Sequence, residues 1–209
     1  MTRGTAHLLE TMRADDGRVE RLEAHLARLD ASAEALERRV DLEEVRGELR
    51  RALAGARGRT RVRLTVGPDG APAAEVAPLP PAPFRTAAVY PEPMEEAGTW
   101  RCTLKTTARA HYDRAVAWAE AAGVDEPILL NPDRHVVEGA RTSVFVRIGD
   151  GWCTPPASAG GLPGIARAAW LAEGAREATL TPADLWRADA VVLANALRGR
   201  MRVRLVRLS

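Results

Sequence analysis

Apolar residues recur at helical spacing in two stretches near the start of the chain. Between Leu22 and Leu36 the leucines and alanines lie three or four positions apart, which predicts a helix with one buried face. A second helix is expected to begin at a capping box formed by Asp41 and Glu44 and to run to about Ala56, because these residues precede another apolar stretch.

Alternation of apolar and polar residues predicts strands on both sides of these helices. Residues 7–12 and 18–22 flank an Asp-Gly pair, which is typical of a tight β-hairpin. Residues 60–66 and 73–76 alternate in the same way around the turn Pro68-Asp69-Gly70. The four strands and two helices together predict a small α+β unit.

A proline-rich segment separates this unit from the rest of the chain. Pro78-Leu79-Pro80-Pro81-Ala82-Pro83 cannot continue a β-ladder, because each proline lacks a backbone N–H donor and restricts the residue before it. We therefore predict a small α+β domain at residues 1–77, a linker at residues 78–83 and a larger domain at residues 84–209.

Short strands alternate with turns beyond the linker. Two helices are expected there, one at about residues 108–122 before Gly123 and one at residues 165–173 after Pro163-Gly164. The strands are expected at residues 85–90, 128–131, 136–137, 143–148 and 151–154, and near Ala190 and Val203. This order predicts a two-domain protein of mixed α+β (α/β) class.

Composition and charge narrow the classes of function. Thirty basic and 28 acidic residues are interleaved and leave a net charge of +2, which argues against nucleic acid as a partner. The one basic cluster, Arg198 to Arg207, has a period near two and predicts the solvated face of an edge strand. No membrane span, signal peptide or metal-ligand spacing is present, so a soluble cytoplasmic protein without a metal site is expected.

Lysine occurs only once, at Lys105, and the other 29 basic residues are arginine. A coding bias could leave one lysine by chance, or this position could need an amine, since a guanidinium can neither attack as a nucleophile nor form a Schiff base. An amine here would suit pyridoxal 5'-phosphate, whose aldehyde takes a lysine and whose phosphate and ring nitrogen need separate anchors.

Three segments are candidates for those anchors. The turn before Ile165 opens a helix whose free N–H groups could face an anion, although such turns often only start a helix. Glu138 ends an apolar strand, where a pyridinium N–H could pair with an inward carboxylate, or where the carboxylate could be solvated. Arg28 lies among core leucines and could reach a phosphate, although most arginines of this chain are expected at the surface.

Taken in order, six segments resemble the fold-type IV pyridoxal-phosphate enzymes, which comprise branched-chain and D-amino-acid aminotransferases and 4-amino-4-deoxychorismate lyases. The segments are LLETMR (Leu8 to Arg13), HLARL (His25 to Leu29), LKTTARAHYDRA (Leu104 to Ala115), VVEGARTSVF (Val136 to Phe145), TPPASAGGLPGIAR (Thr154 to Arg167) and ADAVVLANALRG (Ala188 to Gly199). They cover almost the whole chain. The resemblance implies the D-amino-acid aminotransferase-like two-domain fold, shortened before the first segment.

The resemblance also implies the anchors of the cofactor. Lys105 would be the Schiff-base lysine, Glu138 the partner of the ring nitrogen and Arg28 a phosphate ligand. Leu162 would pack against the cofactor ring.

Further cofactor contacts follow from the same resemblance. The backbone amides of Ile165 and Ala166, after Gly164, would hold the phosphate. The chain departs from the family pattern at two of these places, since Ala166 replaces a threonine and Ser143 replaces an asparagine. A second phosphate threonine is also missing, and its place falls beside Asn195.

Within the family, the chain looks most like the 4-amino-4-deoxychorismate lyases, and above all like the lyase part fused to aminodeoxychorismate synthase. This implies formation of 4-aminobenzoate and pyruvate in folate biosynthesis. By the resemblance Thr11 could assist protonation of the leaving group, or it could be an ordinary strand threonine, and Arg63 and Arg109 are candidates for binding substrate carboxylates. A class IV aminotransferase of branched-chain or D-amino-acid type remains an alternative, as does a catalytically degenerate cofactor-binding partner domain. A homodimer is expected, and an aminodeoxychorismate synthase is a candidate partner.

Overall fold

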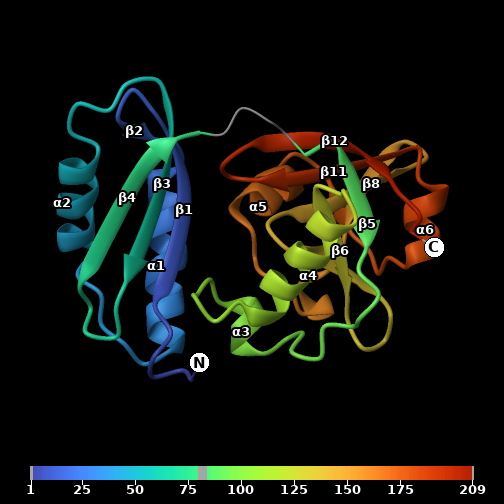
Figure 1. The fold of residues 1–209 in the computed structure, drawn as a ribbon, viewed down its shortest axis with the longest axis horizontal. Helices are drawn as coiled ribbons and strands as arrows, with labels where there is room; N and C mark the ends of the chain where they lie inside the picture. The colour runs from blue at the N-terminus through green and yellow to red at the C-terminus, as the bar shows by residue number, and fades with distance from the viewer. Residues whose placement is uncertain (1, 80–83, 209) are drawn as a thin grey trace. The chain divides into compact units, whose positions relative to one another are not determined.

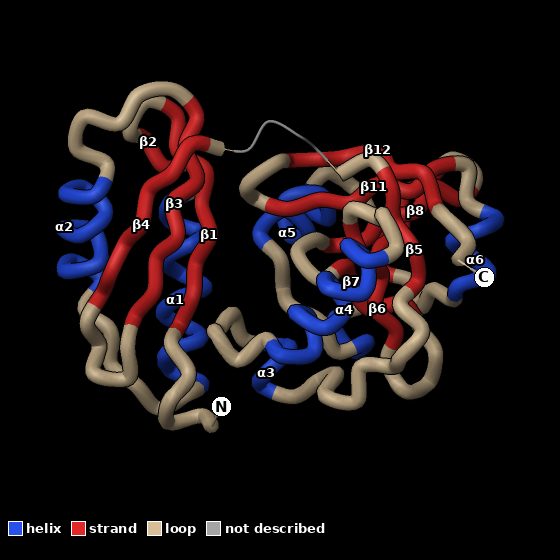
Figure 2. The backbone as a smooth tube through the Cα atoms, in the orientation of Figure 1, coloured by secondary structure: helices blue, strands red, loops and turns tan. Residues whose placement is uncertain are grey.

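The computed structural model describes residues 2–79 and 84–208, which fall into two units. The first unit holds the N-terminal part of the chain together with Leu104–Ala108, and the second holds the remainder (Figure 1, Figure 2). Of the predicted linker, Pro78 ends a strand of the first unit, whereas residues 80–83 lie outside the described residues. No local signal in the sequence indicated that Leu104–Ala108 groups with the first unit.

The first unit is a four-stranded antiparallel sheet in the order β2-β1-β3-β4. Its strands are β1 (Leu8–Asp15), β2 (Arg18–Val19), β3 (Arg59–Val66) and β4 (Pro72–Pro78). Helices α1 (Leu22–Ala35) and α2 (Leu42–Ala52) both cover one face of this sheet (Figure 1). This unit therefore combines a sheet with helices on one of its faces.

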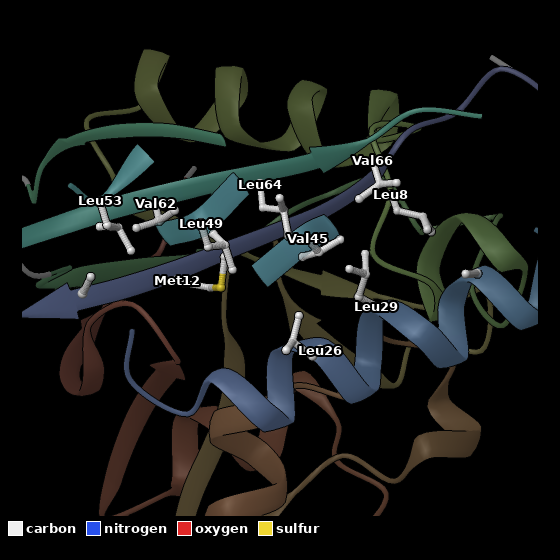
Figure 3. Packing of buried hydrophobic residues seen from close by; sticks show 12 residues of the cluster. Leu8, Met12, Leu26, Leu29, Val45, Leu49, Leu53, Val62, Leu64 and Val66 are labelled. Carbon is white, nitrogen blue, oxygen red and sulfur yellow. The ribbon is translucent and has the colours of Figure 1, made fainter. Parts of the chain in front are cut away.

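The core of this unit lies between the two helices and alternate residues of the strands (Figure 3). Leu8 and Met12 of β1 point toward the helices, as do the even-numbered residues of β3. Helices α1 and α2 contribute Leu26, Leu29, Val45 and Leu49 to the core. Because successive side chains of a strand point to opposite faces, the odd-numbered residues of β1 and β3 occupy the other face of the sheet.

Local signals predicted where these elements begin better than where they end, since α2 ends at Ala52 and not at about Ala56. Asp16 and Gly17 both have positive φ, 47° and 79°, as the tight turn of a right-twisted hairpin requires. The Asp41 side chain accepts from the N–H groups of Glu43 and Glu44 and caps α2. The prediction of a complete capping box is wrong, since among the described residues no bond returns from the Glu44 side chain to Asp41.

The second unit contains an eight-stranded mixed sheet in the order β10-β9-β8-β11-β12-β5-β6-β7. Its strands are β5 (Thr86–Val89), β6 (Glu126–Leu130), β7 (Val136–Gly139), β8 (Ser143–Ile148), β9 (Gly151–Thr154), β10 (Arg176–Glu177), β11 (Ala190–Asn195) and β12 (Gly199–Leu205). The sheet is curled, and one of its faces packs around an aliphatic core that includes Ile128, Val144 and Leu193.

Helices pack on the opposite face of this sheet. They are α3 (Trp100–Thr103), α4 (Ala110–Ala121) and α5 (Ile165–Ala172). Tyr112 of α4 packs near Leu129 and Val137, while Trp170 of α5 stacks on Phe145 with ring centroids 4.0 Å apart. In the part of the chain that the structure describes, no helix is both long and apolar enough to cross a bilayer.

Several short helical elements were not predicted from the sequence. Besides α3, they are α6 (Pro182–Arg187) and a 3-10 turn at Ala157–Ala159. Helix α6 begins with a complete capping box of Thr181 and Asp184 and with proline in its first turn, so its start signal was present in the sequence. Leu185 of α6 is a buried member of the aliphatic core.

The prediction of an edge strand at the C-terminus is wrong. Strand β12 lies between β11 and β5 and pairs with both. The expected alternation is nevertheless present, with Arg200, Arg202 and Arg204 exposed and Met201 and Val203 buried. An interior strand shows this pattern whenever one face of its sheet is solvated, so alternation alone does not identify an edge.

Candidate functional site

Lys105 lies beside strand β1 in the first unit. The Leu9 N–H donates to the Lys105 carbonyl and the Thr107 N–H donates to the His7 carbonyl, each at 2.9 Å. This pattern places Thr106 opposite Leu8. Since Leu8 points into the core, Lys105 lies on the opposite face of the sheet, across from Leu9.

The same face carries Thr11 and two arginines of β3. Thr11 pairs with Arg63, and Arg13 pairs with Arg61. Among the described residues neither Arg61 nor Arg63 has an ion-pair partner, and the Arg61 Nε is buried without a hydrogen bond. We call Lys105, Thr11, Arg61 and Arg63 the lysine face. It brings together the two residues that the sequence predicted as catalytic and three basic side chains, with Glu75 of β4 opposite Arg63.

Arg28 approaches β1 from the helix side. Its Nε and Nη2 donate to the two carboxylate oxygens of Glu10, at 2.8 and 2.7 Å. The His25 Nδ1 lies 2.7 Å from the same carboxylate. Sequence reasoning missed Glu10 and His25, although Glu10 alternates with Leu8 and Met12 on the core face, where a carboxylate needs partners.

Glu138 is a buried residue of β7 in the second unit. The Tyr112 hydroxyl donates to its Oε1 at 2.5 Å and the Leu162 N–H donates to the same oxygen at 3.2 Å. Burial and the nearby Glu138 carboxylate raise the pKa of Tyr112 well above its ordinary value, so Tyr112 remains a donor at neutral pH. The predicted partner of the ring nitrogen is therefore held in place on one of its oxygens by two donors.

Tyr112 is a further residue that sequence reasoning did not single out. It is 4% exposed, and the Arg109 guanidinium lies over its ring, 4.7 Å from the centroid. The Arg109 Nη2 also donates to the Ala140 carbonyl at 2.8 Å. Arg109, one of the two arginines suggested for substrate carboxylates, is thus engaged in holding α4 against the turn after β7.

The predicted phosphate-binding turn lies next to Glu138. A small pocket is lined by Glu138, Ser143, Leu162 and Arg167, among others. Gly164 is the N-cap of α5, whose first amides, those of Ile165 and Ala166, have no acceptor within the helix. Free amides at the positive end of a helix favour an anion, so donors for a phosphate lie beside a carboxylate for a ring nitrogen.

Two glycines keep this cradle open. A Cβ at Gly161 would lie 3.0 Å from the Glu138 Cδ and 2.8 Å from the Val137 Cγ1, and a Cβ at Gly164 would lie 2.7 Å from the Ser143 Oγ. Larger residues would therefore push on the residues predicted to contact the cofactor. The Glu138 carboxylate and the amides at the start of α5 are groups that suit the ring nitrogen and the phosphate of pyridoxal phosphate, and the first unit carries the one lysine of the chain.

Gly161→Ala is expected to weaken cofactor binding and to lower stability by about 1–3 kcal/mol, because the added methyl group must displace Val137 or Glu138. Titration with pyridoxal phosphate and thermal unfolding would measure both effects. Gly47→Ala in α2 is the matched control, where the Cβ meets only the Arg50 side chain at 3.8 Å. That change should stabilise the protein by about 0.5–1 kcal/mol. Unaltered cofactor affinity in Gly161→Ala would contradict the role given to this glycine.

The remaining residues that were predicted to contact the cofactor are Ala166 and Asn195, and each has different neighbours. Ala166 packs against the cluster of Phe145 and Trp170. Asn195 ends β11, where its Nδ2 donates to the Arg141 carbonyl at 3.1 Å and its Oδ1 accepts from the Arg198 N–H at 2.8 Å. The Asn195 side chain thus secures the β11–β12 turn, and its role toward a cofactor stays a prediction.

Comparisons with known proteins show which family and which solved structures the chain is similar to. A sequence model of the amino-transferase class IV family matches residues 7–206. No curated protein matches the chain in sequence. Among solved structures, one from Mesorhizobium loti, provisionally named an amino-acid aminotransferase, is 34% identical with a TM-score of 0.91. That match covers 96% of this chain and 100% of the other.

Two further solved structures carry different names. One is provisionally named a 4-amino-4-deoxychorismate lyase and is 29% identical, with a TM-score of 0.84 and coverage of 95% of this chain and 84% of the other. The other, a hypothetical aminotransferase from Mycobacterium tuberculosis in a form with α-ketoglutarate and PMP bound, is 25% identical. It has a TM-score of 0.84 and covers 99% of this chain and 85% of the other.

Proposed function

Because the chain belongs to the class IV aminotransferase family, and is therefore a pyridoxal-phosphate-dependent enzyme, we propose that it acts as a lyase on 4-amino-4-deoxychorismate. The products would be 4-aminobenzoate and pyruvate. The observation that carries this proposal is the lysine face, on which a hydroxyl and two arginines without ion-pair partners accompany Lys105 in the part of the chain that the structure describes.

The substrate offers groups that suit these residues. It has two carboxylates, which Arg61 and Arg63 can bind as charge-assisted donors. Thr11 lies two residues from Leu9, which is opposite Lys105, so Thr11 and Lys105 are diagonal neighbours about 7–8 Å apart. A substrate about the size of one six-membered ring can therefore meet the amine and the hydroxyl together.

Each residue has a role in the proposed reaction. Bound pyridoxal phosphate withdraws electrons from the carbon that bears the substrate's amino group and so makes its proton acidic. Lys105 would hold the cofactor until the amino group of the substrate takes its place, and the released lysine amine would then take that proton as a general base. Thr11 donates to the ether oxygen as the bond from the neighbouring ring carbon to that oxygen breaks, which leaves an aromatic ring. By the resemblance, Glu138 would pair with the ring nitrogen, and Arg28 and the first turn of α5 would hold the phosphate.

The direct test is turnover without an amino acceptor. Purified protein with pyridoxal phosphate and 4-amino-4-deoxychorismate should release 4-aminobenzoate and pyruvate in equal amounts over many turnovers. Thr11→Val should lower the rate by about 10²-fold or more while the cofactor stays bound, as expected for loss of a proton donor. Thr60→Val, on the core face of the same sheet, is the matched control and should keep the wild-type rate.

An aminotransferase is the second candidate, favoured by the 34% identity to the protein named an amino-acid aminotransferase. In that case turnover would require an oxo acid, and the acceptor would gain the amino group. Acceptor-dependent turnover would therefore contradict the lyase proposal. Bound cofactor with no turnover of any amino donor would instead favour a degenerate domain. The homodimer and the partnership with an aminodeoxychorismate synthase stay predictions from the resemblance.

A further inference from the structure

A carboxylate and a histidine are buried together beneath the predicted phosphate arginine. Glu10 and His25 are each 1% exposed, and the side chain of Arg28 is 12% exposed. The Glu10 carboxylate accepts two hydrogen bonds from Arg28 and also contacts the His25 Nδ1. Neither Glu10 nor His25 has a part in the reaction described above. That reaction therefore does not explain why these two polar side chains are buried together.

We propose that Glu10, supported by His25, is a positioning residue that fixes the Arg28 guanidinium for the phosphate of the cofactor. The inference rests on the proposed role of Arg28 as a phosphate ligand. A guanidinium is planar and carries five N–H donors. Glu10 takes one donor from Nε and one from Nη2, so the direction of the Nη1 edge is set by the same two bonds.

The bidentate geometry is what makes this contact directional. A single hydrogen bond would let the guanidinium rotate about one N–O axis. Two parallel hydrogen bonds fix both the plane of the guanidinium and its orientation within that plane. Helix α1 and strand β1 supply the two partners from opposite sides of the core, so packing of Leu26 and Leu29 also resists movement of Arg28. Arg28 is thus ordered before a ligand arrives, which lowers the entropy cost of binding.

The electrostatics favour the same arrangement. Burial alone would raise the pKa of the Glu10 carboxyl, but the hydrogen bonds from His25 and Arg28 outweigh burial and hold that pKa below its ordinary value. Glu10 is therefore ionised at neutral pH and remains the acceptor for Arg28. The His25 contact adds a third bond to the carboxylate, which prevents Glu10 from rotating away from Arg28.

The test compares the affinities for pyridoxal phosphate and for pyridoxal, which lacks the phosphate. Glu10→Asp keeps the charge but withdraws the carboxylate by one methylene, so it separates geometry from charge. We expect the ratio of the two affinities to fall about tenfold or more in Glu10→Asp and in Glu10→Gln, as for misalignment of one charge-assisted hydrogen bond. Pyridoxal itself should bind as in the wild type, because the Lys105 amine is untouched.

Matched variants make the result decisive. Glu48→Gln changes another buried glutamate of the same unit, which accepts from the Ala74 N–H and pairs with Arg51, and it should leave the ratio unchanged. Thermal unfolding identifies variants that fail to fold. If Glu10→Gln fails to fold, Glu10→Asp and His25→Asn, for which we also expect a lower ratio, take its place. Equal losses for both ligands, or an unchanged ratio in Glu10→Asp, would show that Glu10 is only structural.

Failure of the inference is distinguishable from failure of the proposed function. The affinity ratio does not depend on the fate of the substrate, so an aminotransferase would give the same expected result. Arg28→Gln tests the premise directly and should lower the ratio at least as much as Glu10→Asp. An unchanged ratio in Arg28→Gln would remove both the role of Arg28 and the inference about Glu10.

Discussion

Lys105→Ala is expected to abolish the visible absorbance of lysine-bound cofactor and to lower turnover by at least about 10²–10⁴-fold, the range for loss of a general base. The physical reason is that no other lysine exists in the chain. Pyridoxal phosphate could then bind only through its phosphate and ring contacts. Absorbance spectra of the dialysed protein and peptide mapping after borohydride reduction would measure the loss.

Lys105→Arg tests whether charge or the amine matters at this position. Arginine keeps the positive charge on the lysine face but cannot form the covalent bond, so the band should be lost as in Lys105→Ala. Arg59→Lys, at an exposed position of β3, is the matched control and should keep the band. The combined variant Lys105→Arg with Arg59→Lys again has one lysine, yet should show no band. A reducible cofactor linkage in that variant would contradict the assignment of Lys105.

Glu138→Gln is expected to lower turnover by about 10–100-fold while the cofactor stays covalently bound. The glutamine side chain would be neutral, and a charge-assisted hydrogen bond to the ring nitrogen is worth about 1.5–3 kcal/mol. Tyr112 and Leu162 keep donors on this side chain, so the fold of the pocket should survive. Steady-state rates and the absorbance spectrum of the bound cofactor as a function of pH would measure the effect.

Glu126→Gln is the matched control for this variant. Glu126 is also a fully buried glutamate of the same sheet, but it binds Arg141 and Thr142 at the turn after β7. Burial raises the pKa of the Glu126 carboxyl in spite of Arg141, and Glu126 does not line the pocket beside Glu138. Its spectrum should match that of the wild type. If Glu138→Gln and Glu126→Gln gave the same spectrum and rate, Glu138 would have no contact with the cofactor.

Much of the fold could be predicted from the sequence because its signals are local. The Asp16-Gly17 turn, the Asp41 cap and the alternation in β3 depend on neighbouring residues only, and each is present in the structure. The error at β12 has the opposite cause. Whether a strand is an edge depends on which distant strands pair with it, and alternation carries no information about that.

The same distinction between local and long-range signals applies to the candidate site. Composition alone singled out Lys105, and ordered motifs singled out Glu138 and the turn at Gly164. Nothing local indicated that Lys105 would pair with β1 and share a face with Thr11, because the two residues are far apart in the sequence. Their roles toward a cofactor stay predictions that the variants above address.

The sequence by itself determined which chemical groups this protein possesses: one lysine amine, a carboxylate at a strand end and a glycine turn at a helix start. Only the tertiary structure decided which partners hold those groups. Tyr112 reaches Glu138 and Glu10 reaches Arg28 across 26 and 18 positions of chain. Such contacts depend on how helices pack against sheets, and packing is a property of the whole fold that no single segment encodes.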